Sequence, residues 1–206
     1  MTFHNVLPKE QQWTHLLGKE LNIPNIINDG LGCGSNPRIL RTTFDYLSCQ
    51  TDISNTLVII QLTNPFRFEF NEGPNFWGRC NNNSCVAHDV NYGKKFTAVK
   101  SRYYTTEAEF NEFFQQVLAI ECMLKSFNIK KYFFIHYNGD EEFKTINNQS
   151  KRFLDKSISW ASSLNMSESS IFKSNFEKIS NTDHHPGIRG NEQVKDWLLN
   201  LIKHRL

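Results

Sequence analysis

The chain lacks most of the features that mark secreted or membrane-bound proteins. Its 206 residues include five cysteines, an odd number without the spacing of a small disulfide-rich domain. Reduced thiols are therefore expected. No apolar run approaches the roughly 20 residues that a transmembrane helix needs. The first residues also lack the basic start and apolar middle of a signal peptide. These absences predict a cytoplasmic protein with no membrane partner.

An excess of charge of one sign is also absent. Lys and Arg number 23 and Asp and Glu number 21, which gives a formal net charge of +2. Without a basic excess there is no strong attraction to a phosphate backbone, so no nucleic-acid partner is expected. Hydrophobic residues make up 39% of the chain and phenylalanine alone contributes 17 residues, enough to fill a substantial core. We therefore expect a single domain over residues 1–206, and the oligomeric state stays open.

Apolar periodicity divides the chain into alternating helices and strands. Helical spacing predicts helices starting near Lys9 and after Asn36, over residues 105–128 and over about the last 15 residues. Continuous apolar runs predict strands at 23–27, 56–62 and 130–137, and the last two resemble strands buried on both faces. The alternation is typical of an α/β fold with a parallel sheet between layers of helices.

Local signals set the expected helix starts and loops. Asn36 is expected to cap its helix, with Pro37 at the first helical position. Thr106 and Glu109 have the spacing of a capping box. Residues 63–102 are rich in Asn and Gly and are expected to form a long excursion with little regular structure. Short helical pieces are expected within residues 139–180.

Three segments have the composition of a catalytic site, and each is expected at the carboxyl edge of the sheet. They are "NDGLGCGSN" (28–36), "QLTNPFRFEF" (61–70) and the segment that includes "DHHP" (183–186). The first offers backbone N–H groups, the second polar side chains and the third a carboxylate beside imidazoles. Oxyanion donors with an acid–base pair indicate acyl transfer. A nucleophile is missing from this set.

The ordered motifs "GCGSNPRILRTT", "TLVIIQLTNPFRFEF" and "DHHPGIRGNEQVKDWLLNLI" resemble those of the SGNH hydrolases, the GDSL-type esterases. The likeness is to the branch common in phage and bacterial genomes. It implies a flavodoxin-like three-layer sandwich with a mostly parallel sheet. It also implies hydrolysis of an acyl or acetyl ester, on a small molecule or a glycan, without a cofactor. For the phage branch, the expected location is the cytoplasm of an infected host cell.

The resemblance also implies roles for individual residues. His185 corresponds to the general base and Asp183 to the carboxylate that holds its tautomer. Gly34 and Asn64 correspond to oxyanion donors, although Thr63 could replace Asn64 because the usual Gly-x-Asn-Asp motif is altered here. Arg67 is predicted to bind the substrate, and pairing with a nearby carboxylate is the alternative.

The first block of the family would lie immediately upstream of Met1. That block is a strand that ends in Gly-Asp-Ser or Gly-Cys-Ser, so the first strand is missing or truncated in this sequence. The resemblance therefore implies little hydrolysis by the chain as printed. A start assigned too late, a truncated form and a relative that lost catalysis all remain open. The alternative function is a non-catalytic carbohydrate- or ligand-binding module, for which Phe76, Trp77 and Tyr92 are suitable contacts.

Other patterns favour simpler interpretations. Ser35 could act as a nucleophile, but a capping hydroxyl is the preferred interpretation. Gly30, Gly32 and Gly34 have the spacing G-x-G-x-G, which lacks the third, helix-packing glycine of a dinucleotide-binding fingerprint.

A metal site is a further alternative in the excursion. Cys80, Cys85 and His88 have the spacing C-x4-C-x2-H, which could supply three zinc ligands, but no fourth ligand is evident. The simpler interpretation is incidental thiols in a loop. No metal is assigned, and whether these residues bind one stays open.

Overall fold

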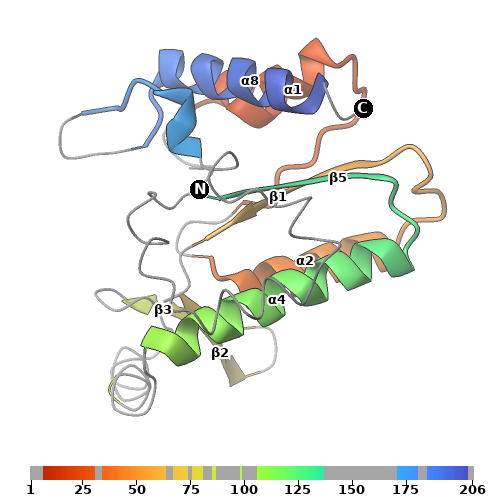
Figure 1. The fold of residues 1–206 in the computed structure, drawn as a ribbon, viewed down its shortest axis with the longest axis vertical. Coiled ribbons are helices and arrows are strands. Elements are labelled where there is room, and N and C mark those ends of the chain that lie inside the picture. Colours follow the sequence, from red (N-terminus) through yellow and green to blue (C-terminus); the bar gives the residue numbers. More distant parts are fainter. Residues whose placement is uncertain are drawn as a thin grey trace.

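The computed structural model describes residues 7–30, 34–63, 67–73, 76–80, 85–86, 98, 106–136, 171–180 and 185–203. This part of the chain is a mixed α/β structure around a small parallel sheet (Figure 1). The sheet consists of β1 (Leu57–Leu62) and β5 (Lys131–His136), which pair in parallel from Leu57 opposite Lys131 to Leu62 opposite His136. The predicted strands at 56–62 and 130–137 are therefore confirmed.

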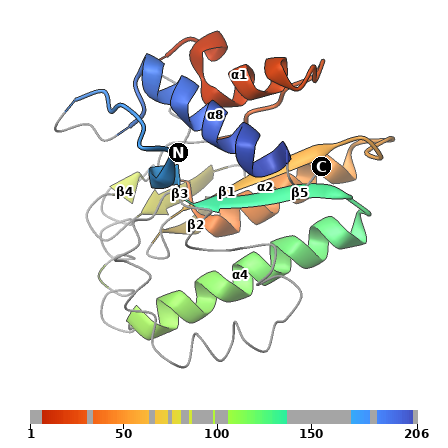
Figure 2. The same cartoon turned by 45° about the horizontal axis from the view of Figure 1, so that its top comes forward.

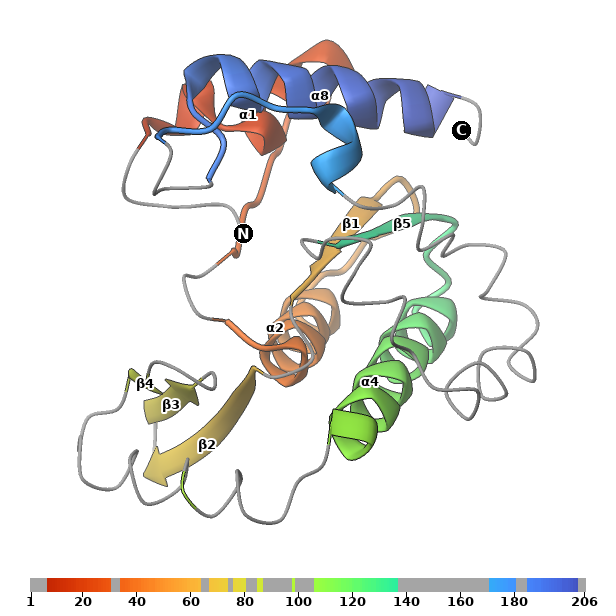
Figure 3. The same cartoon turned by 60° about the vertical axis from the view of Figure 1, so that its left-hand side comes forward.

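Four helices cover the two faces of this sheet. One face carries α1 (Trp13–Glu20) and α8 (Ile188–Lys203), and the other carries α2 (Asn36–Ser48) and α4 (Thr106–Ser126). Figure 3 shows the two helix pairs on opposite sides of the strands. Short 3-10 turns precede α1 (η1, Lys9–Gln11) and lie beside α8 (η2, Ile171–Ser174). Among the helices described, none is long and apolar enough to cross a membrane.

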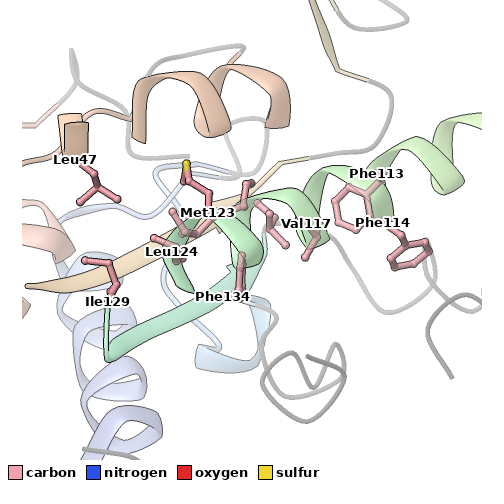
Figure 4. Packing of buried hydrophobic residues seen from close by; sticks show 11 residues of the cluster. Leu47, Phe113, Phe114, Val117, Met123, Leu124, Ile129 and Phe134 are labelled. Atoms are coloured by element: carbon pink, nitrogen blue, oxygen red, sulfur yellow. The ribbon is translucent and has the colours of Figure 1, made fainter. Parts of the chain in front are cut away.

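Alternating strand residues supply two hydrophobic cores. Ile60, Leu62 and Phe134 pack against α2 and α4, in the cluster shown in Figure 4. Phe133 and Ile135 point the other way and pack against α1 and α8. Both strands are thus covered on both faces, which explains why their sequences are continuously apolar instead of alternating.

A polar cluster around the buried Glu121 joins α4 to β5. The Tyr132 hydroxyl donates to Glu121 Oε1 at 2.9 Å, and Lys125 Nζ lies 3.0 Å from the same oxygen. Desolvation, followed by the hydrogen bond to Glu121, raises the pKa of Tyr132 to about 12. Because an unfolded tyrosine ionises near pH 10, the native state holds the phenolic proton over a range in which the unfolded state has lost it.

The Tyr132→Phe variant tests this cluster. We expect wild-type stability to fall as the pH rises from about 10 to about 12, because only the unfolded state ionises there. Tyr132→Phe should lose about 0.5–1.5 kcal/mol at neutral pH through the missing hydrogen bond, and should show a smaller alkaline decrease. Urea unfolding at several pH values measures both effects. Tyr46→Phe, at an exposed position, is the control, and an equal alkaline decrease in wild type and Tyr132→Phe would contradict the prediction.

The predicted strand at 23–27 is wrong. These residues are not assigned to a strand, and the side chain of Ile27 is 61% exposed. Pro24 cannot donate to a strand ladder, and the Ile26 side chain instead lies against Gly18 of α1.

The prediction of little regular structure at 63–102 is also wrong for the described part of this range. β2 (Phe68–Gly73), β3 (Phe76–Cys80) and β4 (Cys85–Val86) form a separate antiparallel sheet. β2 and β3 are joined by only two residues and pair with an irregularity between Asn71 and Gly73. The high Asn and Gly content hid a hairpin, because such residues are common in hairpin turns and bulges as well as in loops.

Candidate functional site

The carboxyl ends of β1 and β5 lie on the side of the molecule where α2, α4 and α8 begin (Figures 1 and 2). Helix amino termini carry N–H groups without intrahelical partners and a partial positive charge. This edge is therefore suited to hold an anion or a developing oxyanion. Of the described residues, Thr63 and His136 stand at the two strand ends, and His136 is fully buried.

Ser35 caps α2. Its Oγ accepts a hydrogen bond from the Arg38 N–H at 3.3 Å, and Ser35 itself is fully buried. The preferred interpretation of Ser35 as a capping hydroxyl is confirmed. The predicted cap, Asn36, was wrong by one position, because α2 begins at Asn36 and the side chain of that residue is engaged elsewhere.

Asn36 joins the start of α2 to the end of β1. Its Oδ1 accepts from the Thr63 N–H at 2.9 Å, and its Nδ2 donates to the Thr63 carbonyl at 3.3 Å. Both residues are buried. The two bonds satisfy backbone groups just beyond the last residue of β1 and hold the start of α2 beside that strand. The signal in the sequence is the Asn that directly follows Ser35, and its predicted role as the helix cap is wrong.

Replacing Asn36 with alanine should leave the Thr63 N–H and carbonyl buried without these partners. An unsatisfied buried group has a substantial desolvation cost, so the free energy of unfolding should fall by about 1–2 kcal/mol. Urea unfolding measures the change, with Asn200→Ala at an exposed position of α8 as the matched control. Equal midpoints for the two variants would contradict the assigned role of Asn36.

His185 lies on the segment that leads into α8. The His185 carbonyl accepts from the Ile179 N–H at 2.8 Å, and the Gly187 N–H donates to the Glu177 carbonyl at 2.9 Å. These bonds make a short antiparallel bridge around Lys178 and Pro186. The half-buried His185 is thus held by the backbone hydrogen bonds of its own carbonyl and of the Gly187 N–H.

The same segment is linked to the start of α1. Asn191, in the first turn of α8, accepts a hydrogen bond from the Trp13 N–H at 2.9 Å. Its amide nitrogen donates to the carbonyls of Pro186 at 3.0 Å and Gly187 at 2.8 Å. Residues 185–187 are therefore held close to the first residue of α1, although the two lie far apart in sequence.

The start of α1 is linked in turn to the glycine-rich segment. Asn28 Nδ2 donates to Gln12 Oε1 at 3.0 Å and to Thr14 Oγ1 at 3.2 Å. Asn28 Oδ1 accepts from the Gly30 N–H at 3.1 Å. This segment is also tied to α2, because Arg38 Nη1 donates to the carbonyl of Asp29 at 3.0 Å.

These hydrogen bonds connect the His185 segment, the start of α1, residues 28–30, the start of α2 and the end of β1. Gly34, half-buried, directly precedes the cap of α2. The other two predicted residues of the site, Asp183 and Asn64, lie outside the described residues. The pairing of Asp183 with His185 and the donor role of Asn64 therefore stay predictions.

Arg67 is half-buried and directly precedes β2. The carboxylate of Glu69, two residues further on, has a side chain only 3% exposed and forms an ion pair of 3.3 Å with Arg41 of α2. This pair fixes the antiparallel sheet beside α2, so Arg67 is held near the same edge as Thr63. Substrate binding by Arg67 stays a prediction.

The alternative metal site falls partly outside the described residues. Cys80 and Cys85 lie opposite each other in the β3–β4 pair, whereas His88 lies outside them. Across the described ranges, no group of three or more His, Cys, Asp or Glu residues could hold a metal ion.

Comparison with known proteins gives one match. A family model, described as a family of unknown function (DUF6071), matches residues 7–166. The match covers more than half of the chain, so the chain belongs to this family. No curated protein and no solved structure matches the chain.

Proposed function

We propose that this member of the DUF6071 family is an ester hydrolase domain of the SGNH type, built on a flavodoxin-like sheet. Its site lies where β1 and β5 end. The observation that carries the proposal is the connected set of hydrogen bonds that ties the His185 segment to the glycine-rich turn and to the end of β1. An acyl-transfer site needs its base and its oxyanion donors at one place.

His185 is the general base in this proposal. It takes the proton of a serine hydroxyl as that oxygen attacks the ester carbonyl, and it returns the proton to the leaving alcohol. Asp183 accepts from the second ring nitrogen and thereby holds the imidazole in the tautomer that can accept the serine proton.

Backbone and amide donors stabilise the oxyanion of the tetrahedral intermediate. The Gly34 N–H stands directly before the α2 cap, where the helix dipole favours negative charge. Asn64 is the second donor, and Thr63 is its substitute. Arg67 binds an anionic group of the substrate, which is an acyl or acetyl ester on a small molecule or a glycan.

In SGNH hydrolases the nucleophilic serine follows a strand that precedes the first helix, here α1. Among the described residues, β1 pairs with β5 along one edge only. A further parallel strand on the other edge of β1 would lie between the two helix layers and would end near the starts of α1 and α8. A serine on that strand would stand at the same edge as His185.

The test adds an N-terminal extension to the chain, a β-strand that ends in Gly-Asp-Ser before Met1. Hydrolysis of p-nitrophenyl acetate is followed by release of nitrophenolate. We expect measurable turnover with the extended chain and little with the chain as printed. An extension ending in Gly-Asp-Ala is the matched control, and it should be as inactive as the chain without an extension.

One result would rule out this function. If the Gly-Asp-Ser and Gly-Asp-Ala forms fold to the same extent and show the same background rate, the chain is not a hydrolase of this type. A non-catalytic carbohydrate- or ligand-binding module would then be the remaining candidate. Binding of acetylated oligosaccharides to the unextended chain, measured by calorimetry, is the test of that function.

A further inference from the structure

We propose that Asn191 is a positioning residue that holds the His185 segment in register with the start of α1. The inference rests on the proposed function, because that function places a serine near the start of α1, and His185 takes the proton of this serine. Asn191 is 6% exposed and lies one turn into α8. It lies within the motif "DHHPGIRGNEQVKDWLLNLI", but the resemblance assigns it no role.

Both the oxygen and the nitrogen of the Asn191 side-chain amide form hydrogen bonds. Its Nδ2 donates to two consecutive carbonyls, those of Pro186 and Gly187, at 3.0 and 2.8 Å. Its Oδ1 accepts from the Trp13 N–H at 2.9 Å. A helix begins at Trp13, so this N–H has no intrahelical partner and needs an acceptor. A primary amide offers two donors and an acceptor on one short side chain, which suits this position.

The other bonds of the His185 segment do not provide this link. Ile179 and Glu177 bind the backbone of His185 and Gly187, and both belong to the stretch just before the segment itself. They fix its local shape, and the apolar packing of Ile171 and Phe176 in one cluster with Trp13 of α1 holds that stretch near the helix. Asn191 adds a direct polar link from the segment to the Trp13 N–H, so it sets the position of His185 relative to the start of that helix more closely than apolar packing alone.

A small displacement at this point has a large effect on the proposed reaction. Proton transfer from serine requires the imidazole within hydrogen-bond distance, and a shift of about 1 Å can reduce the rate about a hundredfold. Substrate binding depends on other groups. Loss of the Asn191 link should therefore lower kcat and leave KM nearly unchanged.

The Asn191→Asp variant removes the donor function of the amide and keeps its acceptor function. The variant keeps the size of the side chain and the oxygen that accepts from Trp13. It replaces the donor NH2 by a carboxylate oxygen that faces the carbonyls of Pro186 and Gly187, which repels them. Asn200→Asp makes the same chemical change at an exposed position of the same helix and is the matched control.

Amide hydrogen exchange on the full 206-residue chain gives the decisive measurement. In Asn191→Asp we expect the Ile179 and Gly187 amides to exchange at least about tenfold faster, because their bonds belong to the released segment. The Leu198 and Leu199 amides, in the middle of α8, should be unchanged. Asn200→Asp should exchange like wild type at all four positions.

Two outcomes would overturn the inference. Unchanged exchange at Ile179 and Gly187 would show that Asn191 does not hold the segment. Equally faster exchange throughout α8 would show that Asn191 only supports the packing of that helix.

Activity separates this inference from the proposed function. In the chain extended with Gly-Asp-Ser, Asn191→Asp should reduce kcat about 10- to 100-fold at constant KM. If the extended wild type does not hydrolyse the ester, the proposed function fails, while faster exchange confined to the segment still supports the structural role of Asn191. If the extended wild type is active and Asn191→Asp matches it in kcat, the positioning role is wrong.

Discussion

Replacing His185 with alanine is expected to reduce kcat for p-nitrophenyl acetate by about a thousandfold or more in the chain extended with Gly-Asp-Ser. Without the imidazole, the serine hydroxyl keeps its proton and remains a weak nucleophile. Loss of the base from such a catalytic set removes nearly all of the acceleration, and oxyanion donors and binding leave only a residual rate. Initial rates over a range of substrate concentrations give kcat and KM separately.

His184 supplies the matched control for this experiment. His184→Ala removes the same side chain one position earlier in "DHHP", and it should change kcat by no more than about twofold. Equal effects of the two substitutions, or an unaffected rate in His185→Ala, would remove His185 from its proposed role. Circular dichroism of both variants establishes that a lost rate does not reflect unfolding.

Sequence periodicity was sufficient for the main elements of this fold. The continuous apolar runs of β1 and β5 and the apolar stripe of α8 identify surfaces that must be buried on one or both sides. Such surfaces dominate the free energy of folding, so the sequence pattern specifies them directly. On α8, Val194, Leu198 and Ile202 recur every four residues and are all buried, whereas Trp197 and Leu201 are half-buried.

The antiparallel sheet was missed because its signals are local and ambiguous. Asn and Gly are typical of loops, but they are equally suited to the short connection and the irregularity of a hairpin. The segment at 23–27 shows the opposite error. Its isoleucines suggested a strand, but tertiary contacts decide strand formation, and one of these side chains, Ile27, faces solvent.

The polar bonds of the candidate site could not be predicted from the sequence. The bond from Trp13 to Asn191 joins residues 178 positions apart, so no local sequence pattern predicts it. The sequence predicts Asn36 as a helix cap, but the residue type alone does not distinguish a cap from a side chain that binds the end of a strand. Hydrogen-bond partners separate these two roles, because Ser35 Oγ accepts from the Arg38 N–H whereas the Asn36 amide binds the backbone of Thr63.

Gly190→Ala should destabilise the protein by about 3 kcal/mol, near the upper end of the cost of overpacking. A Cβ at this position would lie 2.1 Å from the Glu177 carbonyl oxygen, and 3.1 Å from the carbonyl carbon. Alanine is the better helix former by about 1 kcal/mol, but that gain is smaller than the cost of moving a backbone carbonyl. Urea unfolding measures the change in free energy.

Gly187→Ala is the matched control, because both glycines contact the same stretch of backbone. A Cβ at Gly187 would meet its nearest atoms at 3.7, 3.8 and 3.9 Å, which are ordinary contacts. Its free energy of unfolding should stay within about 1 kcal/mol of wild type. The Glu177 carbonyl also accepts from the Gly187 N–H, so a shift forced by alanine at 190 would move the His185 segment as well. Gly190→Ala should therefore lower stability, and in the chain extended with Gly-Asp-Ser it should also lower the proposed hydrolysis of p-nitrophenyl acetate. Wild-type behaviour in both assays would show that the close approach of α8 to Glu177 is not required.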